Sequence, residues 1–263
     1  LDLKFVLEGS SVLNVSLISE TPERDIDFIN KLCQTFLAEN LERKNDAATK
    51  TMRFIDEQLD AVSKSLSVSE GAMTEFRRSN QIVDLPTHST EVLGKATQYD
   101  EKRAELKLRE TYLNYLTNYL RTNLASGAVV APSSLGLNEP MLMSLVQQFN
   151  ELISERNKIS ERNPLYAKYD REIDNLKLSI NEVVKNMRAS MNIEEDDLNK
   201  KIAGVQKEID ALPNKEMEMI SIERKYRVDD NYYTFFLQER SEAAIQKASN
   251  SPDNNILDKA RVI

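Results

Sequence analysis

The chain has 263 residues, a length that accommodates one or two domains. Charged residues make up 30% of it and hydrophobic residues 40%, a balance that favours long helices with much exposed surface. The formal net charge is -8 and the pI about 5.0. A general nucleic-acid binder needs a concentrated basic face, which this sequence lacks, so we expect no nucleic-acid partner.

The rarest residue types exclude several kinds of site. Cys33 is the single cysteine, so the chain can form neither an internal disulfide nor a cysteine-cluster metal site. Its apolar neighbours predict a small buried side chain. His88 is the single histidine and follows Pro86 in a sequence typical of a loop, where we expect it to be solvated. These residues offer no partners for a catalytic triad or a soft metal site, so we expect no cofactor or metal.

The ends of the chain suggest a part of a longer protein. No apolar run reaches the roughly 18 residues that a membrane-spanning helix needs. The sequence starts at Leu1 rather than at a methionine and stops in mid-pattern at Ile263. We therefore expect an excised domain, with any targeting or membrane segment outside it.

The first 18 residues predict a β-hairpin, because apolar and polar residues alternate on both sides of the turn sequence Glu8-Gly9-Ser10-Ser11. Thr21-Pro22 then predicts the start of a helix that runs to about Leu41. Threonine caps helix N-termini, and proline is tolerated at the first helical position.

A heptad seam follows in the next helical stretch, where apolar residues recur at steps of three and four. Ser69 occupies the one polar position of this seam. Pro86 disfavours helix in the residue before it, so the helix is expected to end between Ser79 and Leu85. The seam comprises Met52, Ile55, Leu59, Val62, Leu66, Ser69, Met73 and Phe76.

Four further helices are expected, over residues 90–124, 139–160, 165–212 and 215–248, with a linker over 126–138. The third of these carries two consecutive steps of four, at Val183, Met187 and Met191. Such a step pattern resembles a stutter, which locally unwinds a coiled coil. At 1.5 Å per residue this helix is expected to be about 65–70 Å long.

The last residues predict a closing strand. Ile256, Leu257, Ala260 and Val262 follow a polar break and could pair with the N-terminal hairpin. The expected fold class is therefore α+β and predominantly α, with the N-terminal and C-terminal strands in one sheet.

Three local patterns could carry chemistry, and each has a structural explanation. The carboxylates at 194–197 are adjacent on a helix and so point in different directions, which favours a solvated face over a cation site. The aromatic cluster at 232–236 could stack on sugars or face lipid, but core packing where the last helix meets the sheet is favoured. The same holds for Tyr112, Tyr115 and Tyr119. No glycine-rich phosphate loop is present, so we expect no catalytic and no cofactor-binding residues.

The ends of the chain nevertheless resemble a known family. The segments 222–228, 233–245 and 256–260 are similar to the end of the periplasmic domain of bacterial polysaccharide co-polymerases. These are the Wzz/Wzc-type chain-length determinant proteins, which include the tyrosine-autokinase branch of capsule and exopolysaccharide export. The stretch 12–23, then Ile29-Asn30-Lys31-Leu32 and Phe54 to Leu59, looks like the opening of that domain. The motif residues carried over as structural are Pro22, Arg224, Tyr226, Tyr233, Glu239, Glu242 and Asp258.

The resemblance implies a single periplasmic domain over 1–263. Residues 1–44 and 240–263 would form a membrane-proximal α/β base, and residues 45–239 a long helical protrusion. It implies an inner-membrane protein anchored by flanking transmembrane helices, which assembles with copies of itself through lateral helix and base contacts. It also implies polysaccharide polymerase or export machinery as partners, and any kinase domain on the cytoplasmic side, outside this chain.

Two other classes of function remain open at this stage. A helical-hairpin adaptor of a membrane-fusion-type export system would share the seams, but it would interrupt a lipoyl-like or barrel domain. An enzyme with an acidic site at Glu194–Asp197 would need residues that converge on a substrate. The resemblance favours a non-catalytic scaffold that regulates polysaccharide chain length or export.

Overall fold

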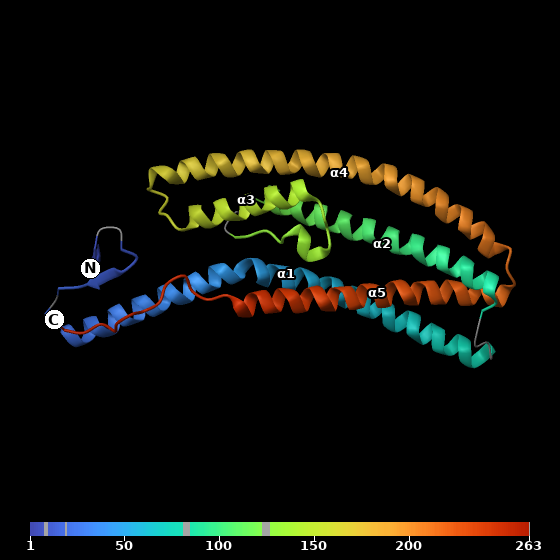
Figure 1. Cartoon of the computed structure of the whole chain (residues 1–263), viewed down its shortest axis with the longest axis horizontal. Helices are drawn as coiled ribbons and strands as arrows, with labels where there is room; N and C mark the ends of the chain where they lie inside the picture. The colour runs from blue at the N-terminus through green and yellow to red at the C-terminus, as the bar shows by residue number, and fades with distance from the viewer. Residues whose placement is uncertain (8–9, 19, 81–84, 123–126, 263) are drawn as a thin grey trace. The chain divides into compact units, whose positions relative to one another are not determined.

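The computed structural model describes residues 1–7, 10–18, 20–80, 85–122 and 127–262. Within these ranges the chain is mostly helical (Figure 1), as the sequence predicts. The elements are β1 (Asp2–Phe5), β2 (Leu13–Ser16), α1 (Pro22–Asn80), α2 (Thr87–Arg121), the 3-10 helix η1 (Pro132–Leu135), α3 (Pro140–Asn157), α4 (Pro164–Asp210) and α5 (Asn214–Ser249).

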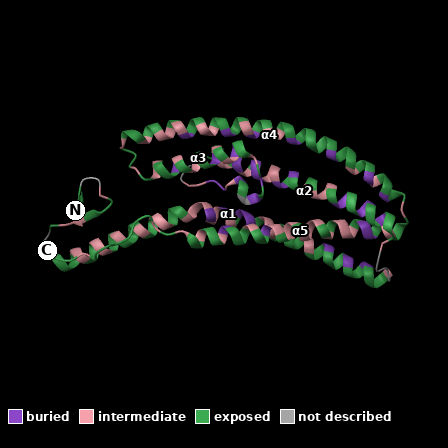
Figure 2. Cartoon of the chain, viewed as in Figure 1, coloured by how far each residue is buried: buried purple, intermediate pink, exposed green. Residues whose placement is uncertain are grey.

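The chain divides into two compact units. Residues 1–46 and 248–263 form one, called here the terminal unit, and residues 47–247 form the other, called the helical unit. Buried residues occur in the helical unit, whereas no described residue of the terminal unit is buried (Figure 2).

The terminal unit contains the expected hairpin. Strands β1 and β2 pair antiparallel, with Leu3 opposite Val15 and Phe5 opposite Leu13. Residues 8 and 9 of the expected turn lie outside the described residues. The hydroxyl of Ser10 accepts a hydrogen bond from the backbone N–H of Val12 at 3.0 Å, just before β2 begins.

The predicted C-terminal strand is wrong. The described sheet has two strands, β1 and β2, and residues 250–262 form neither strand nor helix. Polar side chains of α1 hold this segment instead. The side-chain oxygen of Asn40 accepts from the backbone N–H of Asp253 at 3.0 Å, and that of Asn30 accepts from Ala260 at 3.1 Å. These bonds pair the N–H groups of Asp253 and Ala260, and most residues of the segment are exposed, so water can pair the other backbone groups without a strand partner.

Proline positions the helix starts. Pro22, Pro140 and Pro164 are the first residues of α1, α3 and α4, where the missing N–H costs nothing. The side chain of Asn163 caps α4 by accepting from the backbone N–H of Leu165 at 2.9 Å. The sequence predicts Asn163-Pro164 as a break, and it is the junction between α3 and α4.

Two boundaries differ from the sequence prediction. The helical stretches expected at 21–41 and from residue 52 onward are one continuous helix, α1. Helix α2 begins at Thr87, so His88 lies exposed in its first turn and not in a loop. Pro86 adopts an extended conformation and its carbonyl accepts from Thr90 at 2.9 Å, which lets the helix start directly after the proline.

Cys33, expected to be buried, is half-buried on α1.

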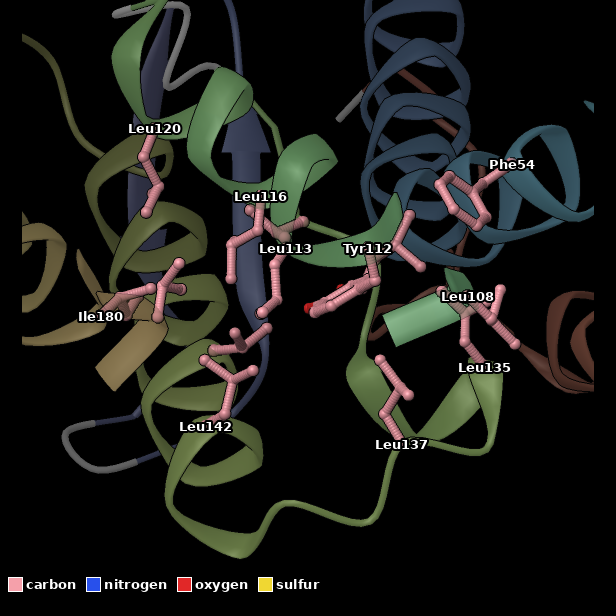
Figure 3. Close-up of a cluster of buried hydrophobic side chains, with 14 of the residues drawn as sticks. Phe54, Leu108, Tyr112, Leu113, Leu116, Leu120, Leu135, Leu137, Leu142 and Ile180 are labelled. Atoms are coloured by element: carbon pink, nitrogen blue, oxygen red, sulfur yellow. The ribbon is translucent and has the colours of Figure 1, made fainter. Parts of the chain in front are cut away.

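In the helical unit, α4 packs along both α2 and α3. Their apolar faces form a core in which Leu113, Leu142 and Ile180 converge from the three helices (Figure 3). The described residues of the heptad seam on α1 are buried or half-buried, as predicted. A second cluster joins the start of α2, the end of α4 and the start of α5 through Val92, Leu93, Ala96, Val205, Ile209 and Ile220.

The buried residues of α4 follow the predicted apolar seam. They recur at steps of seven, with steps of four from Ile180 to Val184 and from Val205 to Ile209: Ile173, Ile180, Val184, Met191, Leu198, Val205 and Ile209. Steps of four and seven keep residues close to one face of a helix, so α4 buries one stripe along a length of about 70 Å. The stutter expected at Val183, Met187 and Met191 stays a prediction.

The segment expected to be a linker is part of the core. Val129 and Val130 are fully buried, and Leu135 and Leu137 of the η1 region are nearly so. Pro132 and Gly136 within it are the residues that predicted a linker, and its apolar residues are the ones that the core buries. None of the described helices is long and apolar enough to cross a membrane.

Truncation of the core should be costly only where the side chain is buried. Ile180→Ala removes a fully buried side chain from α4 and is expected to lower the free energy of unfolding by about 2–5 kcal/mol. Leu178→Ala, on the same helix but 70% exposed, is the matched control and should change it by less than about 0.5 kcal/mol. Urea denaturation compares the two, and equal losses would contradict the described packing.

Candidate functional site

The described residues show no arrangement suited to catalysis. Among the described residues no group of three metal-ligating side chains lies close enough to hold a metal ion. The four carboxylates at 194–197 are all exposed on α4. Asp197 pairs with Lys201 at 2.6 Å, and this ammonium holds the pKa of Asp197 below its usual value. The stretch is therefore a solvated helix face in this structure, and its carboxylates do not converge.

The tyrosines of α2 hold the buried segment that leads to η1. The hydroxyl of Tyr112 donates to the carbonyl oxygen of Val130 at 2.9 Å, and the hydroxyl of Tyr115 accepts from the N–H of the same residue at 3.3 Å. The hydroxyl of Tyr119 donates to the carbonyl oxygen of Gly127. The three tyrosines serve core packing and backbone satisfaction, as favoured from the sequence.

Asn150 of α3 also binds the backbone of this segment. Its side-chain oxygen accepts from the N–H of Val129 at 2.7 Å, and its side-chain nitrogen donates to the carbonyl of Val129 at 3.0 Å. Two consecutive buried residues thus have both backbone groups paired to side chains. Buried backbone groups need partners, and here no neighbouring strand supplies them.

The aromatic cluster of α5 is also a packing element, but its partner is not the sheet. Phe236 is buried, and its ring lies 5.3 Å from that of Phe235. The hydroxyl of Tyr232 contacts the carbonyl of Glu101 on α2 at 3.4 Å. At Gly136, where φ is 66°, an added Cβ would lie 3.1 Å from the ring of Phe235. The cluster therefore packs on α2 and on the turn after η1.

Asp229 of α5 connects to the polar position of the α1 seam. Its carboxylate accepts from the hydroxyl of Ser65 at 2.8 Å and from that of Ser69 at 3.1 Å. Ser69 is 2% exposed. The polar position in the apolar seam therefore places hydroxyls opposite a carboxylate. Such a polar contact favours one register of α1 against α5, because sliding either helix would break it. The seam pattern identified Ser69, but nothing in the sequence pointed to Asp229 as its partner.

The predicted motif residues do not gather into one site. In the helical unit Arg224 pairs with Asp100 of α2 at 3.4 Å, while Tyr226 and Tyr233 are half-buried on α5. Glu239 is half-buried there too, and burial together with nearby Glu242 raises its pKa.

The other motif residues have plainer positions. Glu242 is exposed and accepts from Gln238 at 3.0 Å. In the terminal unit Pro22 begins α1 and Asp258 is exposed in the C-terminal segment. Arg224 is the motif residue with a clear contact between helices.

A pocket of about 290 Å³ opens where α2, the start of α3 and α4 meet. It lies entirely within the helical unit, and Arg109 of α2 lines it. A second depression is lined by residues of α1 alone, so no other element helps to enclose it. The pocket between the three helices is the better candidate for a small-molecule site.

The known proteins that resemble this chain are bacterial tyrosine-protein kinases. A putative tyrosine-protein kinase in the cps region of Klebsiella pneumoniae is 24% identical over 155 residues, which cover 59% of this chain and 19% of the relative. The tyrosine-protein kinase wzc of Salmonella typhi is 28% identical over 109 residues, covering 41% and 15%. The tyrosine-protein kinase etk of Escherichia coli K12 is 23% identical over 107 residues, covering 41% and 15%.

These matches define the class that the chain resembles, the polysaccharide co-polymerases. Within that class the similarity is to the Wzc/Etk/Ptk tyrosine-kinase branch, so the resemblance inferred from the sequence is confirmed. The chain matches less than a fifth of the length of each of these relatives. No family model matches it, and no solved structure matches it significantly.

Removal of the seam carboxylate should weaken the helical unit. Asp229→Ala leaves the hydroxyl of Ser65 without its acceptor and is expected to cost about 1–3 kcal/mol of unfolding free energy in urea denaturation. Asp230→Ala is the control, because no hydrogen bond or ion pair is described for that neighbouring side chain. Its effect should stay within about 0.5 kcal/mol. Equal losses would show that the register contact contributes nothing.

Alkaline pH should destabilise the α5 aromatic cluster. Burial, with the nearby carboxylates Glu105 and Glu101, raises the pKa of Tyr232 to about 12. The folded state therefore favours the neutral phenol over the unfolded chain, in which tyrosine titrates near a pKa of about 10. Stability is expected to be retained below about pH 10 and lost progressively as the pH rises toward 12.

The variant Tyr232→Phe tests this assignment. It should reduce the loss of unfolding free energy between pH 10 and 11.5, although burial also raises the pKa of Tyr112 and leaves part of that loss in place. It should leave the pH dependence below pH 9 unchanged. Chemical denaturation at fixed pH values measures both ranges. An unaltered alkaline slope would refute the assignment to Tyr232.

Proposed function

We propose that this chain is the periplasmic domain of a polysaccharide co-polymerase of the Wzc type and acts there as a non-catalytic, self-associating scaffold. In this role it regulates the chain length or the export of a capsular polysaccharide, an exopolysaccharide or an O-antigen. The observation that carries the proposal is the similarity to Wzc/Etk-type proteins, which in the Klebsiella relative extends over 59% of the chain. Any kinase chemistry would lie in other parts of the parent protein.

The terminal unit supports the assembly role. It has no buried residue among those described, yet several large apolar side chains in it are exposed. Leu3 and Phe5 of β1 are 56% and 66% exposed, and Phe28 of α1 is 51% exposed. Leu3 and Phe5 share one face of β1, and exposed apolar side chains that gather on one face are a common mark of an interaction surface. In the proposal this unit corresponds to the membrane-proximal base, residues 1–44 and 240–263, where copies of the chain contact each other.

The helical unit corresponds in the proposal to the protrusion, residues 45–239. Its helices bury one face and leave the other charged and exposed, as on α4. Lateral contacts between copies would use these outer faces. The membrane anchors, the periplasmic location at the inner membrane and the export machinery as partner belong to the same proposal.

The membrane-fusion adaptor is not favoured. It requires a lipoyl-like or barrel domain, and in the described part of the chain the strands are the two short ones of the terminal hairpin. An acidic enzyme site is not favoured either, because the carboxylates at 194–197 lie exposed along one helix.

The test uses the full-length protein in nanodiscs and in cells. The double variant Leu3→Asp/Phe5→Asp places charge on the exposed apolar face of β1. It is expected to reduce the oligomer mass measured by native mass spectrometry and to change the polymer length distribution on gels. Asn14→Asp, which adds a charge on the paired strand beside Lys4, is the control and should change neither. The scaffold proposal is refuted if the unmodified full-length protein is a monomer in the membrane. It is also refuted if Leu3→Asp/Phe5→Asp gives the same polymer length as the control Asn14→Asp.

A further inference from the structure

The pocket of the helical unit has an apolar side. Five side chains of α3 and α4 line it: Met141, Leu142, Val183, Met187 and Met191. Leu142 is fully buried and Met191 is 9% exposed, whereas Met141 is 68% exposed at the rim. Methionine thioethers are polarizable and adapt to an apolar surface of irregular shape. This side can therefore cover the flat C–H face of a bound molecule.

Arg109 of α2 also lines the pocket. The Nη atoms of Arg109 pair with Glu105 at 3.1 Å and with Glu194 at 3.6 Å. Its Nε is buried and has no hydrogen-bond partner in the described part of the chain. A buried donor without a partner carries a desolvation cost. The Nη atoms bring a positive charge to the same lining.

Three further polar side chains line the pocket, Glu139 before α3 and Asn186 and Ser190 on α4. No hydrogen bond or ion pair of these side chains is described. Together with Arg109 they offer both donors and acceptors around the apolar surface. A small-molecule site has this composition, with an apolar wall and a few convergent polar groups.

This combination suits a sugar ring. A pyranose presents C–H groups on its face and hydroxyls, each a donor and an acceptor, around its edge. The pocket volume of about 290 Å³ is just below the roughly 300–1,000 Å³ typical of sites for drug-sized molecules, so it suits one ring rather than a long segment. The charges select among sugars. Two carboxylates already pair with Arg109 and Glu139 adds a third, so the local charge is negative and a uronic acid is disfavoured.

We infer that the pocket between α2, α3 and α4 binds a neutral or amino-sugar unit of a saccharide. Recognition follows from the pocket lining alone. The source of the saccharide rests on the proposed function, which would make it a unit of the exported polymer as it passes the helical unit.

The test is a binding titration of the whole chain, labelled with ¹³C at the methionine methyl groups. The probes are maltotetraose as the neutral saccharide, the tetramer of glucosamine as the amino sugar and tetragalacturonate as the acidic one. A leucine-rich peptide represents an apolar protein partner. The signals of Met141, Met187 and Met191 report on the pocket, and those of Met52 and Met73 on α1 are internal references.

The expected result is a saturable shift of the pocket methyl signals with maltotetraose or the glucosamine tetramer. The variant Asn186→Ala/Ser190→Ala should weaken this binding about tenfold, as the loss of two hydrogen bonds implies. Asn192→Ala, an exposed asparagine of α4 outside the pocket, is the matched control and should bind like the unmodified chain. Circular dichroism of each variant shows that the helices are retained.

Three results would overturn the inference. These are no saturable shift with either saccharide, a shift that Asn186→Ala/Ser190→Ala leaves unchanged, or a shift caused only by tetragalacturonate or by the leucine-rich peptide. The oligomer mass and polymer length of the full-length protein, measured as above, keep the two proposals apart. A failure of saccharide binding with normal assembly refutes this inference alone, and binding without assembly refutes the scaffold role alone.

Discussion

The packing of α4 along α2 and α3 is the interaction on which the helical unit depends. A helix of 47 residues cannot be stable through propensity alone, and most of its stability must come from burying an apolar stripe. The stripe is continuous because the buried residues of α4, from Ile173 to Ile209, recur at steps of seven and four. The pocket and the buried segment before η1 lie beside these packed helices.

Polar contacts then select one arrangement among those that apolar packing would allow. Apolar seams tolerate sliding by a heptad, because leucine and isoleucine fit many similar holes. Asp229 opposite Ser65 and Ser69 removes that freedom between α1 and α5. Tyr112 and Asn150 fix the position of the segment at 129–130 by pairing its buried backbone groups. Specificity in this unit therefore comes from a few hydrogen bonds placed within an apolar core.

The two units differ in how their apolar side chains are packed. In the helical unit the core residues find apolar partners within the chain, although single apolar side chains such as Leu178 and Ile193 remain exposed among charged residues. In the terminal unit apolar side chains such as Phe5 and Phe28 remain exposed, so that unit is the place where partners outside the chain would be needed. This contrast, together with the similarity to Wzc-type proteins, is why the proposed scaffold role is assigned to contacts between copies and not to chemistry within one chain.

The sequence by itself determined the local elements. Periodicity identified the long helices and their buried faces, proline and asparagine marked their ends, and alternation identified the hairpin, because these signals depend on residues a few positions apart. It also determined the resemblance, through short motifs near the C-terminus. It did not determine what depends on residues far apart in the chain.

Only the tertiary structure placed Asp229 beside Ser69, buried Val129 and Val130 under the tyrosines, and bound residues 250–262 to asparagines of α1 in place of a strand. It also brought Arg109, Glu139 and Asn186 to one pocket. Those outcomes depend on which faces meet in space, and a pattern along one chain carries no record of the partner that satisfies a given polar group.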